Sequence, residues 1–221
     1  MNILFFRRIS LFYFLCCLFL FSCASSSEKA EIWKINSVSE IGGNPTDVVG
    51  NPNIVKTEAG GAVEFDGKKD GLLVDKNPIV GLNNFSIEVD FKPFNGYPEN
   101  NEQRFLHIQD PENEARRILI ELRLNSRNEW YGDWFIKTEN QDLALIDSTL
   151  THPVNEWATI RLTYENGQMK GFVNGKQQLT GDIEYLPIGE NGRVSIGTRM
   201  DKRSWFKGLI KEVRFSEQAS T

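Results

Sequence analysis

Three polar residues near the middle of the sequence, His107, Glu121 and Arg123, are of types that could act on an acidic sugar. Residues 105–109 and 117–123 alternate apolar and polar side chains, so each segment predicts a strand with its polar residues on one face. An arginine can bind a uronate carboxylate through two hydrogen bonds, and a histidine can act as a base near neutral pH. If the strands are neighbours, these residues form a lyase-like set, although salt links between strands are the interpretation we favour.

Aromatic residues form a second candidate site, because a ring face can stack on a sugar ring. Trp130 and Trp134 share one face of the alternating segment 130–137, where they suit either a core or a ligand platform. Trp205 lies in a polar loop, residues 199–205, and is expected to be the most exposed tryptophan. Together with Arg123 and Arg199, these tryptophans are the predicted ligand-binding residues.

Metal sites are weakly supported by the sequence. Its two histidines are too few for a His-ligated centre, and no cysteine follows Cys23. Calcium needs only oxygen ligands, and the loop carboxylates Asp66, Asp70 and Asp201 could contribute to a structural calcium site. The sequence has no nucleophile elbow, phosphate-binding glycine loop or dinucleotide fingerprint.

The N-terminus has the pattern of a secretory signal peptide. Arg7 and Arg8 precede an apolar run at residues 11–21 that is too short to span a bilayer. Residues 20–23, Leu-Phe-Ser-Cys, resemble the lipobox of bacterial lipoproteins, which implies a diacylglyceryl group and acyl chains such as palmitate on Cys23. We therefore predict a signal peptide at 1–22, a lipidated tether at 23–30 and one domain at 31–221. Ala24 after the cysteine favours the outer membrane, and ordinary secretion with cleavage within 24–27 is the alternative.

Charge and cysteine content exclude two further classes. All three cysteines lie at or before position 23, so the mature domain has no disulfide framework. Two of the 25 basic residues would leave with the signal, whereas all 30 acidic residues would stay. An acidic domain of this kind is not expected to bind nucleic acid.

Short alternating segments separated by turn residues predict an all-β fold. In residues 85–92 every second residue is apolar, and Asn-Gly pairs at 166–167 and 174–175 predict two consecutive hairpins. No helical periodicity longer than a turn or two is present. The prediction is an antiparallel two-sheet sandwich.

Four groups of segments resemble the LamG-like jelly rolls of the concanavalin A-like lectin/glucanase superfamily. They are residues 62–67 with 71–74, residues 85–91, residues 155–160 with 167–176, and residues 194–197 with 206–215. The resemblance implies a jelly roll that binds carbohydrate or protein, often with a structural calcium ion, and it places Trp157 in the core. Lys211 stands where relatives commonly have an aspartate, which argues against a calcium site at that position.

The enzymes of this superfamily are matched less well. Glu88 and Asp90 fit the first part of a Glu-x-Asp-x-x-Glu glycosidase strand, but Pro93 occupies the position of the second glutamate. The alginate lyases have comparable Arg, Glu and His residues, but their tyrosine-bearing strand has no counterpart here. We therefore favour a cell-envelope lipoprotein that binds a glycan or polysaccharide without catalysis and contacts the membrane through its lipid. A polysaccharide-active enzyme using His107, Glu121 and Arg123, and a protein-binding adhesion or assembly module, are the alternatives.

Overall fold

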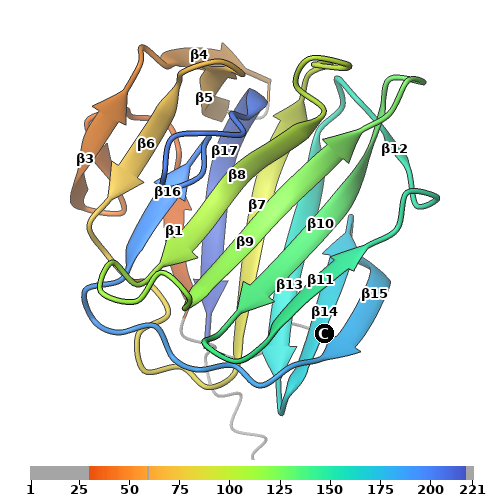
Figure 1. Ribbon diagram of the computed structural model, residues 1–221. Coiled ribbons are helices and arrows are strands. Elements are labelled where there is room, and N and C mark those ends of the chain that lie inside the picture. Colours follow the sequence, from red (N-terminus) through yellow and green to blue (C-terminus); the bar gives the residue numbers. More distant parts are fainter. Residues whose placement is uncertain (1–29, 59, 218–221) are drawn as a thin grey trace, which may run out of the picture.

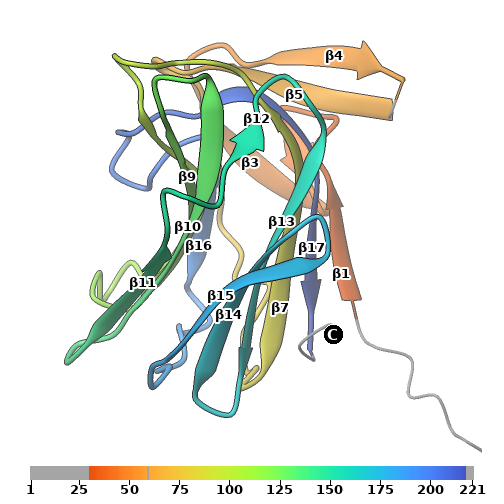
Figure 2. The same ribbon diagram turned by 90° about the vertical axis from the view of Figure 1, so that its right-hand side faces the viewer.

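The protein is described by a computed structural model that covers residues 30–58 and 60–217. The predicted signal peptide and the lipidation site at Cys23 lie outside these residues. Every regular element of the described chain is a strand, and the strands form two antiparallel sheets that face each other (Figures 1 and 2). No helix in this part of the chain could cross a membrane.

The first sheet has eight strands. In spatial order it contains β15 (Lys176–Asp182), β14 (Gln168–Val173), β13 (Ala158–Glu165), β7 (Phe85–Pro93), β17 (Lys207–Ser216), β5 (Gly60–Asp66) and β4 (Asn53–Thr57), with β1 (Ala30–Lys34) paired to β17. Two predicted hairpins join β13, β14 and β15. Asn166 and Asn174 have φ values of 51° and 49°, and the glycine after each also has positive φ, as the predicted turn type requires.

The second sheet has nine strands and is seen face-on in Figure 1. In spatial order it contains β11 (Asp142–Ile146), β10 (Glu129–Lys137), β9 (Arg117–Leu124), β8 (Glu102–Gln109), β16 (Arg193–Ile196), β6 (Gly71–Val74), β3 (Asn44–Val49) and β2 (Glu40–Ile41), with β12 (His152–Pro153) paired to β10. Strands far apart in the sequence thus become neighbours, as β8 and β16 do. The antiparallel two-sheet sandwich predicted from the alternation and the jelly roll implied by the family resemblance are both confirmed.

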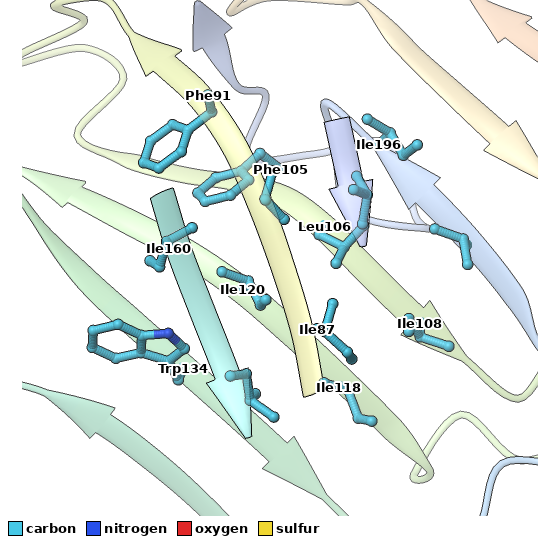
Figure 3. Packing of buried hydrophobic residues seen from close by; sticks show 14 of the residues in the cluster. Ile87, Phe91, Phe105, Leu106, Ile108, Ile118, Ile120, Trp134, Ile160 and Ile196 are labelled. Carbon is cyan, nitrogen blue, oxygen red and sulfur yellow. The ribbon is translucent and has the colours of Figure 1, made fainter. Parts of the chain in front are cut away.

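The core fills the space between the sheets, where the apolar side of each alternating strand points inward (Figure 3). The Phe91 ring from β7 stacks on the Phe105 ring from β8, with 4.7 Å between centroids, and Trp130 meets Phe91 edge-on at 5.1 Å. Burial of such large rings supplies much of the stabilisation of the sandwich.

Trp134 of β10 occupies a space that glycines on both sheets leave open. A Cβ atom added to Gly132 on β10 or to Gly171 on β14 would lie 2.4 Å from an atom of the Trp134 ring. The two sheets therefore accommodate this indole only because neither position carries a side chain.

Candidate functional site

Three neighbouring strands of the nine-stranded sheet bring charged residues together on its outer face. In the β8–β9 register Arg104 lies opposite Glu121, and in the β9–β10 register Glu121 lies opposite Asp133. Arg123, two residues further along β9, lies opposite Glu102. The condition set for the lyase-like residues, that the strands of His107 and Glu121 are neighbours, is thus met, because β8 pairs directly with β9.

These residues surround an open pocket of about 190 Å³, which we call the arginine pocket. Its lining consists of Arg104, Arg117, Leu119, Glu121, Arg123, Asp133, Phe135, Ala144 and Arg199. Two predicted site residues from β9, Glu121 and Arg123, therefore meet Arg199 from the loop after β16. Phe135 and Asp133 were not predicted as site residues, although the alternation of residues 130–137 places both on the face opposite the tryptophans.

Ion pairs tie the carboxylates of the pocket to two of its four arginines. Arg104 Nε donates to Glu121 Oε1 at 2.7 Å, and Arg123 Nη2 donates to Asp133 Oδ2 at 2.9 Å. Glu102, at the edge, accepts from Arg123 Nη1 at 2.6 Å and also pairs with Arg104. The salt links between strands that the sequence favoured are therefore present.

The buried carboxyl groups hold their protons more tightly than exposed ones. Burial raises the pKa of Glu121 to about 7, since the loss of hydration outweighs the attraction of Arg104. Burial likewise raises the pKa of Asp133, opposed by its bond to Arg123. Glu121 therefore keeps its proton to a higher pH than an exposed glutamate does.

Of the other two arginines, Arg117 has no ion pair with a carboxylate among the described residues, and Arg199 has a long one. Arg117 donates from Nη1 to the backbone oxygen of Glu114 at 2.7 Å, and its buried Nε has no hydrogen-bond partner among the described residues. Arg199 Nε lies 3.7 Å from Asp201 Oδ1, which is beyond a normal hydrogen bond. The pKa of Arg117 is lowered by burial and then by the charge of Arg199.

His107 is fully buried and does not line the pocket. Its Nδ1 accepts a hydrogen bond from the backbone N–H of Met200 at 3.0 Å, so it anchors the loop that carries Arg199. Burial, followed by the charges of Arg199, Arg117 and Arg104, holds its pKa well below the ordinary value. A buried, neutral imidazole cannot reach a bound sugar, so the predicted role of His107 as a base disagrees with this placement.

The tryptophans require three corrections. Trp130 and Trp134 have 0% and 1% of their surface exposed, so their predicted role as a sugar platform is wrong. Trp157 was assigned to the core, but it is half-buried on the outer face of the other sheet, with Lys211 Nζ 5.4 Å from its ring centroid. Trp205 is also only half-buried, but it lies outside the pocket lining.

The three carboxylates proposed for calcium have other partners. Asp66 Oδ1 accepts hydrogen bonds from three backbone N–H groups, those of residues 68, 69 and 70. Asp70 accepts from the backbone of Asn51 and Asp66, while Asp201 pairs with Arg203 at 2.7 Å. Across residues 30–58 and 60–217 no three such side chains gather as a metal site. These three carboxylates are therefore not gathered into one site, and the suggested calcium ion stays a prediction.

Comparisons with known proteins agree with this architecture. Domain 4 of AbnA, a GH43 extracellular arabinanase from Geobacillus stearothermophilus solved with arabinotriose, matches with a TM-score of 0.65 and 18% identity, over 88% of this chain and 95% of that one. The heptameric SAP-like pentraxin from Limulus polyphemus gives 0.58 and 14%, over 72% and 77%. The binding domain of botulinum neurotoxin DC, solved in complex with SialylT, gives 0.60 and 16%, over 87% of this chain and 48% of that one.

At these identities the structural matches show the fold alone. A search of curated protein sequences gave no match. The family model described as "Concanavalin A-like lectin/glucanases superfamily" matches residues 44–221, which is most of the sequence. The chain therefore belongs to the concanavalin A-like lectin/glucanase superfamily.

Proposed function

We propose that this domain binds carbohydrate in the arginine pocket and does not catalyse a reaction on it. The observation that carries the proposal is the lining itself, in which charged groups surround the apolar side chains of Phe135, Leu119 and Ala144. A sugar offers the matching combination of apolar ring faces and polar substituents. The arabinotriose bound to the similar arabinanase domain is consistent with this choice of ligand.

The absence of catalysis is supported by the state of the titratable groups in the pocket. Glu121 and Asp133 are each held by an arginine, and His107 is sealed beneath the loop that it anchors. A general base must reach the proton that it removes. One observation favours the enzyme alternative, namely the pKa of about 7 of Glu121, which suits proton transfer at neutral pH.

Binding and turnover can be separated in one experiment with the purified protein. We expect at least one member of a panel of neutral and acidic polysaccharides to bind, as measured by calorimetry, without release of reducing ends or ultraviolet-absorbing unsaturated products. Replacement of Phe135 by alanine is expected to weaken binding about tenfold, because the ring contributes apolar contact to the sugar.

Phe172→Ala is the matched control. Phe172 also lies beneath an arginine, with Arg161 4.4 Å from its ring centroid, but on the outer face of the opposite sheet. Its loss should leave affinity unchanged. If the wild type forms a product and Glu121→Gln does not, the domain is an enzyme and the proposal of binding without catalysis is wrong. If no glycan binds, the protein-binding alternative is favoured.

We further propose that the chain is exported and held at the cell envelope, in the outer membrane, by lipid on Cys23. The support is the sequence of residues 1–24, with two arginines, an apolar run and a lipobox-like end. Two acyl chains suffice for stable anchoring.

Cys23→Ala is expected to move the protein from the detergent phase to the aqueous phase in a detergent-partition assay. The control, Cys17→Ala, alters a cysteine inside the predicted signal and should leave anchoring intact. Intact-mass analysis of membrane-purified protein should show a diacylglyceryl-modified N-terminus at Cys23. An unmodified N-terminus within residues 24–27 would establish ordinary secretion instead.

A further inference from the structure

The arginine pocket has more positive than negative charge after its internal ion pairs are counted. Four guanidinium groups line it, but only the carboxylates of Glu121 and Asp133 do so, with Glu102 at the edge. Arg104 and Arg123 take all three of these carboxylates. Arg117 therefore provides a positive group with no ion pair in the described chain, and Arg199 provides one whose ion pair with Asp201 is 3.7 Å long.

We propose that Arg117 and Arg199 bind the carboxylate or sulfate group of an acidic sugar. This inference rests on the proposed carbohydrate-binding function and specifies its ligand class. A planar guanidinium donates paired hydrogen bonds to an oxyanion, and such charge-assisted bonds are about twice as strong as neutral ones. Arg117 is suited to this role, because it lines the pocket and forms no ion pair with a carboxylate among the described residues.

The geometry holds the two arginines in place before any ligand binds. Arg117 is on β9, braced by its bond to the Glu114 carbonyl, and its guanidinium carbon lies 5.6 Å from the ring centroid of Phe135. Arg199 is carried by the loop that Met200 ties to His107. Positive groups held close together repel each other, and burial makes their charge costly. A bound anion would relieve both costs.

The surroundings favour a sugar ring that carries one acidic group over the phosphate backbone of a nucleic acid. Glu121 and Asp133 lie in the same pocket and would repel a ligand with dense negative charge. Phe135, Leu119 and Ala144 instead offer apolar contact to a ring that carries a single acidic group. The protein as a whole has a net charge of −5, so long-range attraction of polyanions is weak.

The test compares polysaccharides that differ only in their acidic groups. Alginate, polygalacturonate and hyaluronan would each be paired with its carboxyl-reduced neutral form, and chondroitin sulfate with its desulfated form. We expect at least one acidic polymer to bind the purified protein about 100-fold more tightly than its neutral partner. The pairs also distinguish a carboxylate from a sulfate as the group recognised.

Arg117→Gln and Arg199→Gln are each expected to reduce this preference about tenfold, and the double variant should abolish it. Arg193→Gln is the matched control, because Arg193 belongs to the same sheet but pairs with Asp47 and Asp75 outside the pocket. It removes one positive charge and should leave the preference unchanged. Thermal unfolding of each variant would confirm that the fold is retained.

The outcomes separate this inference from the proposed function. Equal binding of acidic and neutral forms, sensitive to Phe135→Ala, would overturn the acidic ligand class and leave carbohydrate binding standing. An acidic preference that survives in the double variant would overturn the assignment to Arg117 and Arg199. Failure of every polymer to bind would remove both proposals.

Discussion

Replacement of Trp134 by alanine is expected to lower the free energy of unfolding by about 3 kcal/mol. The indole is almost completely buried between the two sheets, where it lies near Ile120 and Ile160 in the core (Figure 3). Its removal leaves a cavity that the rigid sheets cannot close. We expect a cost at the lower end of the range for a large buried aromatic residue, because the Trp134 Nε1 has no hydrogen-bond partner among the described residues. The substitution therefore breaks no hydrogen bond of the indole. Urea unfolding followed by circular dichroism would measure the change.

Two variants test the packing explanation. Trp157→Ala removes the same side chain from a half-buried surface position and should cost clearly less. Gly171→Ala places a methyl group 2.4 Å from Trp134 in the native packing, so it should destabilise the wild type. In the Trp134→Ala background the same methyl group should be tolerated, since the ring that it meets has gone. Equal costs of Gly171→Ala in both backgrounds would show that the two residues are not coupled.

Replacement of Glu121 by glutamine is expected to change how stability depends on pH. Glu121 has a pKa of about 7 when folded and an ordinary value of 4.5, so the folded state binds its proton more tightly. The resulting stabilisation is complete below about pH 4.5 and is lost as the pH rises through about 7. The difference between the two values corresponds to about 3 kcal/mol. Relative to wild type, Glu121→Gln should therefore become more stable by about this amount between about pH 4 and about pH 8.

Asp66→Asn is a control with the opposite sign. Burial opposes ionisation of Asp66, but the backbone N–H groups of residues 68–70 outweigh it and lower the pKa of this carboxyl group. Its stabilisation is therefore present above the ordinary pKa and is lost as the pH falls. Urea titrations at several pH values should show Asp66→Asn losing stability relative to wild type as the pH rises. A difference between Glu121→Gln and wild type that does not vary with pH would contradict the raised pKa of Glu121.

The alternation of residue types was sufficient to predict the fold. A strand turns successive side chains to opposite faces, so segments such as 85–92 reveal their strand character locally. The Asn-Gly turns are equally local, because both residues must adopt positive φ. The family resemblance drawn from ordered fragments was confirmed by the match over residues 44–221.

Alternation does not say which face of a strand is buried when both faces carry aromatic residues. In β10, Trp130 and Trp134 lie on one face, and Phe135 lies on the other with Asp133. The tryptophans point inward because glycines at positions 132 and 171, on opposite sheets, leave room for an indole. Only the packing of the two sheets brings these positions together, so the sequence alone could not choose between core and ligand platform.

The arginine pocket likewise depends on contacts between distant segments. Arg117 and Arg199 are 82 positions apart by their numbering in the chain, and they line one pocket because the loop after β16 is held against β8. The same contact buries His107 and changes a predicted base into an anchor. Local sequence therefore determined the strands and the polarity of their faces. The tertiary structure decided which polar groups are paired, which are buried and which can meet a ligand, because hydration and charge partners depend on long-range packing.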